Sequence, residues 1–415
     1  MTVTPVKKCA SSAFVGLLVL CTASTSTKAD DWPFFRGPHY DGVSREDGWN
    51  AKFPDAGPRI AWSREVGIGA SSIIGVDDRV VTMGNRKNKD EDVVICLSAD
   101  DGSIVWEFPY ANKFEERMFD GGTAATPTTD EGHVYTLSYN GHLHCLKLTN
   151  GSVVWKKNVI DDFGGEQPQW KYAGSPCVVN DLLILDIGGN KNSTIALNKK
   201  TGKKVWGSGK GNAGYAPPIP FKNGGKDAVL VFKGKAMHAF SRLDGAELWK
   251  IPWETDYDVN ASSPSVIGDK LFISAGYQTG RGTLYQLGKR VPKKLWRNDD
   301  IKTKMSSCAI YEGHVYGISE KKGVLMCISM ATGDAVWTEP EMGQYGTLKI
   351  AGDKLIILTD SGQLIIADAS SEGYNEISSA KVLDGSCWVN PVLSNGRIYC
   401  RNNKGKLVCV DVRKE

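Results

Sequence analysis

The chain has 415 residues, of which 23 % are charged, and a formal net charge of +3 at pH 7. This near balance excludes the strongly basic surface of a nucleic-acid-binding domain and the block of like charges that forms an acidic tail. Tryptophan recurs at a regular interval along most of the chain, which indicates one repeated unit and therefore one domain despite the length.

Residues 1–29 have the pattern of an export signal. Two lysines precede a short apolar core, and small residues follow as far as Ala29. Such a core is too short to span a bilayer but is typical of a secretory signal, cleaved after Ala29 or after Ala23. The residues ending at Cys21 also resemble a lipid-attachment motif, although Leu20 stands where that motif normally has a small residue. A lipid anchor at Cys21 is therefore an alternative, and no later segment is apolar enough to cross a membrane.

Residues 30–57 form a leader, and a repeat fills residues 58–415. Each copy has a turn that contains glycine, then three or four residues, then Trp, as in the segment from Asn150 to Trp155. Two degraded copies end at Trp296 and Ile377. A period of 40–50 residues, rich in short alternating strands, predicts a β-propeller. The tryptophans of this column are Trp62, Trp106, Trp155, Trp206, Trp249, Trp296 and Trp337.

The second copy shows the strands of one blade most clearly. Alternating apolar residues predict strands at 133–137, 142–148 and 153–156, and Asn140-Gly141 is a strong hairpin signal between the first two. Trp155 stands in the outermost strand. Since Trp combines a large apolar body with one N–H group, we expect this column to cover the gaps between neighbouring sheets and to be structural.

Each blade needs a further, innermost strand next to the central channel. Small residues are expected there because the inner strands crowd together, and proline is tolerated because this strand is an edge. Tracts of this composition occur eight times, which predicts eight blades, with seven as the fallback. The predicted inner strands are 70–72, 124–128, 173–176, 215–218, 261–264, 305–308, 345–347 and 388–391.

The ring is expected to close through its N-terminal strand. The last strand, at 407–412, is a third strand with no outer strand after it, and the missing strand is present at 59–63. Closure of this kind protects sheet edges that would otherwise invite aggregation. The sequence therefore predicts an all-β, eight-bladed propeller of four-stranded antiparallel blades, in which the N-terminal strand completes the last blade.

The cysteines divide into a buried column and one candidate disulfide. A column in the third strands favours small buried hydrophobic residues over disulfides. Cys400 is expected to face Cys409 across the hairpin that turns at Lys404-Gly405, which makes this pair the best candidate for a bridge. The cysteines of the shared column are Cys96, Cys145, Cys327 and Cys409.

No motif of a known catalytic centre occurs in the sequence. There is no nucleophile elbow, phosphate-binding loop or calcium-binding loop. His142 and His144 lie two residues apart on one strand face, a spacing that suits zinc or copper, but no further ligand is evident. We therefore predict no catalytic residue and no metal site.

The candidate site lies in the connectors that lead from each outer strand to the next inner strand. These connectors share one face of a propeller, around the channel mouth, where function usually resides. Three are long, at 111–122, 159–172 and 253–260, and combine carboxylates, aromatic residues and lysines that suit a cation, a sugar or a peptide. The alternatives are solvated loops without a ligand and a catalytic centre with Ca²⁺ on Asp256 and Asp258. The candidate binding residues are Trp170, Lys171, Tyr172, Asp256, Tyr257, Asp258, Asn260, Lys304 and Trp388.

The repeat as a whole resembles the PQQ-like β-propeller repeat. The shared pattern is a Ser-Pro inner strand, a Cys-Leu or Ala-Leu third strand and a Thr-Gly turn ahead of Val-Trp, and it covers about residues 58–412. The leader from Asp31 to Pro38 is also similar to the start of secreted bacterial members of this family.

The family includes quinoprotein alcohol and sugar dehydrogenases and the outer-membrane assembly lipoprotein BamB. The dehydrogenases hold their quinone with Ca²⁺, an Asp base and often a ring made by two adjacent cysteines. This sequence has no adjacent cysteine pair, and the family's Glu–Asn–Asp metal set matches no particular positions. The resemblance therefore implies a BamB-like binding role, for which no cofactor is expected.

These observations together predict an exported, monomeric binding or scaffolding module of the periplasm or outer membrane. Its expected partners are envelope proteins, with no nucleic acid among them. One alternative is an oxidoreductase that uses PQQ and Ca²⁺, and the other is recognition of a carbohydrate or peptide at the channel mouth.

Overall fold

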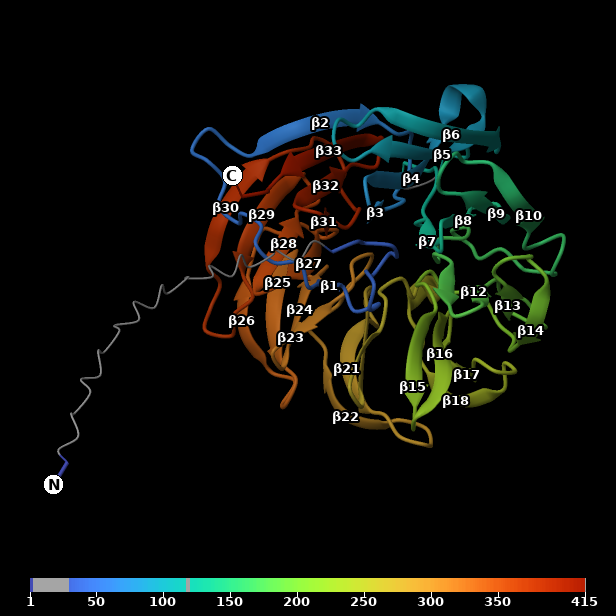
Figure 1. Ribbon diagram of the computed structural model, residues 1–415. Coiled ribbons are helices and arrows are strands. Elements are labelled where there is room, and N and C mark those ends of the chain that lie inside the picture. The colour runs from blue at the N-terminus through green and yellow to red at the C-terminus, as the bar shows by residue number, and fades with distance from the viewer. Residues whose placement is uncertain (3–29, 117–119, 415) are drawn as a thin grey trace.

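The computed structural model describes residues 1–2, 30–116 and 120–414. The predicted signal segment, the candidate lipidation site Cys21 and residues 117–119 lie outside the described residues. Eight antiparallel sheets are arranged as blades around a central axis, which confirms the predicted eight-bladed propeller (Figure 1). Among the described residues, no helix is both long and apolar enough to cross a membrane.

Each blade has four strands in sequence order from the axis outward, except where the N-terminal region joins. Blade 1 consists of β3 (Ile74–Val76), β4 (Arg79–Arg86), β5 (Glu91–Ser98) and β6 (Ile104–Ala111). Blade 2 consists of β7 (Thr128–Asp130), β8 (His133–Leu137), β9 (His142–Lys147) and β10 (Val153–Asn158). Blade 3 consists of β11 (Cys177–Val179), β12 (Leu182–Asp186), β13 (Thr194–Asn198) and β14 (Lys204–Ser208). Blade 4 consists of β15 (Ile219–Asn223), β16 (Lys226–Lys233), β17 (Ala236–Ser241) and β18 (Glu247–Pro252).

Blade 5 consists of β19 (Ser265–Ile267), β20 (Lys270–Ala275), β21 (Arg281–Gln286) and β22 (Lys293–Asn298). Blade 6 consists of β23 (Ala309–Tyr311), β24 (His314–Ser319), β25 (Val324–Ser329) and β26 (Ala335–Glu339). Blade 7 is β27 (Thr347–Ala351), β28 (Lys354–Leu358), β29 (Gln363–Asp368) and β30 (Glu376–Lys381), and blade 8 contains β31 (Val392–Ser394), β32 (Arg397–Arg401) and β33 (Lys406–Asp411). The described residues also form two short 3-10 helices: η1 (Lys87–Lys89) lies in the turn between β4 and β5, and η2 (Asp256–Asp258) lies in the connector after blade 4.

The N-terminal region contributes a strand to each of the last two blades. β2 (Arg59–Glu65) pairs antiparallel with β33 and supplies the outer strand of blade 8, as predicted. β1 (Val43–Ser44) pairs in parallel with the inner strand β27, so blade 7 has five strands. The sequence pattern did not predict this second addition.

The tryptophan column joins neighbouring blades, as expected. Six of its members donate an Nε1 hydrogen bond of 2.7–3.0 Å to a backbone carbonyl oxygen of the next blade, whereas Trp249 donates to the side chain of Asn223. Five of the seven indoles also lie close to the turn glycine of the following repeat, such as Trp106 beside Gly151. The glycine is therefore required partly because the indole occupies the space of a Cβ.

The cysteine column is buried, as predicted, but the predicted disulfide is wrong. Cys409 lies opposite Trp62 and Tyr399, whereas Cys400 lies opposite Val408, in the next row of the same ladder. Successive residues of a strand point to opposite faces, so the two thiols enter different cores. Cys400 packs between blades 7 and 8, Cys409 packs between blades 8 and 1, and both are free.

The inner strands begin later in the chain than predicted. Each starts either at the last residue of the predicted tract or just after the tract. The tracts form the approach to each strand, where most carry a proline that cannot donate to a sheet ladder. Their polar groups bond between blades instead. The backbone N–H of Ser72 donates to Thr126 Oγ1 at 3.0 Å, and that of Thr126 donates to Ser175 Oγ at 2.9 Å.

Blade 7 lacks the column tryptophan, and the leader covers the exposed position. Ser378 lies opposite Ile366 in the ladder, which is the position that a column tryptophan fills in the other blades. The predicted end of this repeat copy, Ile377, was therefore wrong by one residue. Ser378 Oγ donates to the carbonyl oxygen of Ala51 at 2.7 Å. Phe53 of the leader is buried against the same core, where it contributes apolar contact that a tryptophan provides elsewhere.

The first part of the leader crosses the centre of the ring, at the end of the channel where the inner strands turn (Figure 1). Its contacts reach many blades, because each blade offers one inner strand to the axis. They include Trp32 N–H to Gly75 O at 2.6 Å, Thr129 N–H to Pro33 O at 3.0 Å, Tyr40 O–H to Val178 O at 2.6 Å, Arg36 Nη2 to Cys308 O at 2.6 Å, and Lys349 Nζ to Phe35 O at 2.9 Å.

Candidate functional site

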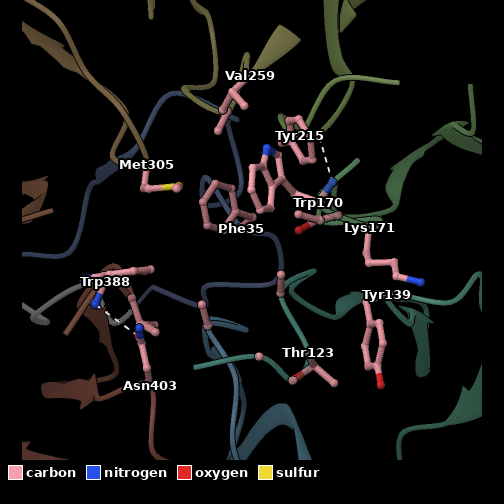
Figure 2. Close-up of a pocket in the computed structure, with 18 of the residues that line it drawn as sticks. Phe35, Thr123, Tyr139, Trp170, Lys171, Tyr215, Val259, Met305, Trp388 and Asn403 are labelled. Carbon is pink, nitrogen blue, oxygen red and sulfur yellow. Dashed lines mark hydrogen bonds between the residues drawn. The ribbon is translucent and has the colours of Figure 1, made fainter. Parts of the chain in front are cut away.

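A cavity of about 200 Å³ lies at the opposite mouth of the channel, where the connectors between blades converge. Its walls are mainly aromatic and aliphatic, and Figure 2 shows Phe35 of the leader at the centre, beside Trp170. The leader thus supplies the floor of the cavity, and connectors from several blades supply its walls. Besides alanines and Pro217, the apolar side chains that line it are Phe35, Tyr139, Trp170, Tyr215, Val259, Tyr277, Met305, Trp388 and Val389.

Neighbouring groups hold the two tryptophans of the wall in place. The backbone N–H of Trp170 donates to the Tyr215 hydroxyl at 3.2 Å (Figure 2). Trp388 stacks on Tyr345 with ring centroids 4.3 Å apart, and its backbone N–H donates to Asn403 Oδ1 at 3.4 Å. Rings fixed in this way present flat apolar faces to a ligand at low cost in side-chain entropy.

The charged groups near the cavity form ion pairs. Glu115 and Lys171 are the charged residues that line the described cavity, and their side chains lie 3.3 Å apart. Lys171 Nζ also donates to Gln167 Oε1 at 2.8 Å. Next to the wall, Lys304 Nζ lies 3.4 Å from Glu320 Oε2 and 4.5 Å from the centre of the Tyr277 ring. The rim therefore carries paired charges of both signs.

The structure brings some of the predicted site residues together and separates others. Trp170, Lys171 and Trp388 line the cavity, and Lys304 contacts its wall. Tyr172 does not line it, because its side chain is buried between blades 2 and 3 and its hydroxyl donates to Ile187 O at 2.8 Å. Burial raises the pKa of Tyr172.

The predicted residues of the connector after blade 4 also lie outside the cavity. Asn260 is buried, and its Nδ2 donates to the backbone oxygens of Lys233 and Gly234, so it fixes the connector. Asp256 Oδ2 accepts from the backbone of Thr279, and Asp258 Oδ2 accepts from Asn212. Tyr257 is exposed near the ring of Tyr277.

Sequence reasoning missed several wall residues. Phe35 belongs to the leader, where no repeat pattern relates it to the channel, although the aromatic run around it was a signal of burial. Tyr139 and Tyr277 lie in the turns between second and third strands, which share this face with the connectors. Counting both sets of loops around the mouth would have found them.

The residues present do not fit a calcium-bound quinone. Calcium takes six to eight oxygen ligands, several of them from carboxylates. The described part of the chain contains no cluster of three His, Cys, Asp or Glu side chains with metal-ligand geometry. Glu115, the carboxylate that lines the cavity, is paired with Lys171, and Asp256 and Asp258 bond to different neighbours. The aromatic faces suit stacking, but among the described residues no cluster of carboxylates accompanies them.

The fold is shared with solved propellers. BamB from Moraxella catarrhalis superposes with a TM-score of 0.63 and 14 % identity, over 86 % of this chain and 98 % of that one. The quinohemoprotein alcohol dehydrogenase from Comamonas testosteroni superposes with a TM-score of 0.65 and 13 % identity, over 93 % and 81 % of the two chains. At this level of identity the likeness concerns the fold alone.

Sequence comparison gives relatives of the same two kinds. The outer membrane protein assembly factor BamB of Escherichia coli (strain K12) is 30 % identical over 115 residues, which span 25 % of this chain and 27 % of that protein. BamB of Burkholderia pseudomallei (strain K96243) is 20 % identical over 323 residues, 72 % of this chain and 74 % of that protein. The quinohemoprotein alcohol dehydrogenase ADH-IIG of Pseudomonas putida is 25 % identical over 158 residues, 35 % of this chain and 21 % of that enzyme.

The family described as outer membrane protein assembly factor BamB matches residues 89–339, more than half of the chain, and the chain therefore belongs to this family of PQQ-like propellers.

Proposed function

We propose that this propeller is a non-catalytic binding module of the cell envelope, which holds a partner protein at the aromatic cavity of the channel mouth. The observation that carries the proposal is the composition of that cavity, in which Trp170, Trp388 and Phe35 offer apolar faces while the rim charges pair with one another. A concave apolar site with few polar groups is the usual form of a binding pocket.

The location and the class of partner rest on two further observations. Residues 1–29 have the pattern of an export signal. The family, and relatives such as the Burkholderia pseudomallei protein, carry the description of an outer membrane protein assembly factor. We infer that the protein is exported to the periplasm or the outer membrane, acts there as a monomer, and binds an envelope protein.

Photo-crosslinking at two matched positions tests this proposal in the cells that express the protein. A photoreactive phenylalanine analogue replaces Tyr257, which is 67 % exposed at the rim, or Val205, which is 52 % exposed on the outer strand β14. We expect a defined adduct with an envelope protein from position 257 and not from position 205. The adduct should disappear when Trp170 and Trp388 are both replaced by Ala. Equal adducts from both positions, or an adduct insensitive to the double substitution, would refute the site.

Titration of the purified protein with PQQ, with and without Ca²⁺, tests the absence of quinone catalysis. We expect no saturable binding, because the described lining of the cavity offers no cluster of carboxylate ligands for Ca²⁺. Tight, calcium-dependent binding would overturn the non-catalytic assignment and make an oxidoreductase the leading function.

A further inference from the structure

The floor of the cavity separates it from two buried cations. Phe35 lines the cavity, and its carbonyl oxygen accepts a hydrogen bond from Lys349 Nζ at 2.9 Å. The same ammonium lies 5.6 Å from the centre of the Phe35 ring and 4.2 Å from that of Trp32. The next residue, Arg36, is 1 % exposed. Two buried basic side chains therefore adjoin the floor: Lys349 contacts Phe35, and Arg36 follows it in the chain.

The guanidinium of Arg36 is incompletely hydrogen-bonded. Its Nη2 donates to Asp41 O, Cys308 O and Ser265 Oγ, but its Nε and Nη1 atoms have no hydrogen-bond partner in the described part of the chain. Burial lowers the pKa of Arg36 to about 10, so this group stays charged at neutral pH. Burial and the charge of Arg36 also lower the pKa of Lys349, while the nearby carboxylate of Asp41 opposes this effect.

The cavity above the floor has the opposite character. Its lining charges, Glu115 and Lys171, pair with each other at 3.3 Å, and its remaining wall is largely apolar. Among the described residues, no unpaired cation lines this space, so an anionic ligand would lose its hydration without a compensating charge, which costs free energy. An uncharged aromatic or aliphatic group would lose only unfavourable contact with water.

We propose that the cavity selects an uncharged aromatic or aliphatic side chain of the partner, and that Phe35 sets this selectivity by keeping Lys349 and Arg36 out of the ligand's reach. This inference rests on the proposed binding function, since it names the chemical class that the same site accepts. Phe35 acts in two ways: its ring supplies an apolar surface, and it blocks the path from the cavity to the ammonium group.

Two probes that differ only in charge test the inference on the purified protein. N-acetyl-phenylalaninamide and N-acetyl-phenylalanine share one aromatic ring, and only the second carries a carboxylate. Binding is followed by ligand-observed NMR and by the fluorescence of the wall tryptophans. We expect the protein to bind the amide at least about tenfold more tightly, because the carboxylate would be desolvated without an unpaired cation among the described lining residues.

Substitution of the floor should change this preference. Phe35→Ala opens the cavity toward Lys349, so the carboxylate should gain affinity and the preference should fall to near equality or reverse. Adding Lys349→Met to Phe35→Ala should restore the preference for the amide. Phe35→Leu keeps an apolar floor and should behave like the natural protein, and melting temperatures confirm that each variant is folded.

The outcomes separate this inference from the proposed function. Equal binding of the two probes by the natural protein, or a preference that Phe35→Ala leaves unchanged in a folded variant, would overturn the role of Phe35. Failure of both probes to bind while the crosslinked adduct forms at position 257 would refute the ligand class and retain the binding function. If position 257 gives no adduct while Trp170 and Trp388 are intact, the binding function itself is refuted.

Discussion

The clearest test of the architecture concerns the turn glycine that faces five of the column tryptophans. In blade 2, Gly151 and Gly132 both have left-handed backbones, with φ of +70° and +74°. A Cβ atom on Gly151 would lie 2.5 Å from Cε3 of Trp106, whereas a Cβ atom on Gly132 would meet no atom within 4 Å. The two positions therefore share the same backbone requirement and differ in the contact with the neighbouring blade.

The difference predicts two distinct losses of stability. Gly132→Ala should cost about 1 kcal/mol, the lower end of the range for an L-residue in the left-handed conformation. Gly151→Ala should cost about 1–3 kcal/mol more, because the new methyl group must displace the Trp106 indole or the turn. With an unfolding entropy of about 0.8 kcal/mol per kelvin for a chain of this size, the two variants should differ by about 1–4 °C in melting temperature.

Differential scanning calorimetry of the two variants measures this difference. The control is the same pair of substitutions made with Trp106→Leu, in which the smaller side chain leaves room for the methyl group and the difference should shrink. Equal melting temperatures for Gly132→Ala and Gly151→Ala would refute the reasoning, because the glycine would then serve the backbone alone.

Three further predictions concern single residues. Trp155→Ala should lower the free energy of unfolding by about 3–5 kcal/mol in urea titration, since it removes a large side chain from between blades and a 2.9 Å hydrogen bond to Lys199 O; an unchanged stability would contradict the role of the column. Burial raises the pKa of the Asp92 carboxyl to about 6, above the unfolded value of about 3.9. Because the folded state then binds this proton more tightly than the unfolded state, the free energy of unfolding should fall by up to about 3 kcal/mol as the pH rises from about 4 to about 6. Asp92→Asn should flatten that part of the curve in urea unfolding at several pH values, and a slope that persists would assign it to other groups. All eight described cysteines should react with an alkylating reagent in urea without prior reduction, as mass spectrometry can show; recovery of Cys400 joined to Cys409 would contradict the register of blade 8.

The sequence predicted the blades because one physical problem recurs in each of them. Every blade must cover the side of the next, and the turn glycine and the tryptophan solve this problem in nearly every copy. The number of blades and the closure by β2 followed from that repetition. Where a copy departs from the rule, as at Ser378, the prediction failed by one residue, because the covering group comes from the leader.

The candidate site was predicted less completely, since its residues occur once each. Trp170 and Tyr172 are near neighbours with similar composition signals, yet only the first lines the cavity, because the backbone of Lys171 between them is left-handed with φ of +68°. Phe35 was missed because the contacts of the leader with several blades follow no period. Such positions depend on long-range packing, which a local pattern does not encode.

The joint between β2 and β33 also determines how the chain must fold. Arg59 and Asp411 form an ion pair across this joint although 352 positions separate them in the sequence. Contacts of such long range make folding slow, because much chain entropy is lost before they form. An open solenoid propagates from any repeat to its neighbours, but this ring is complete only when its first and last strands meet. The ring can therefore close only after β33 has been synthesised, and until then β2 lacks its partner strand.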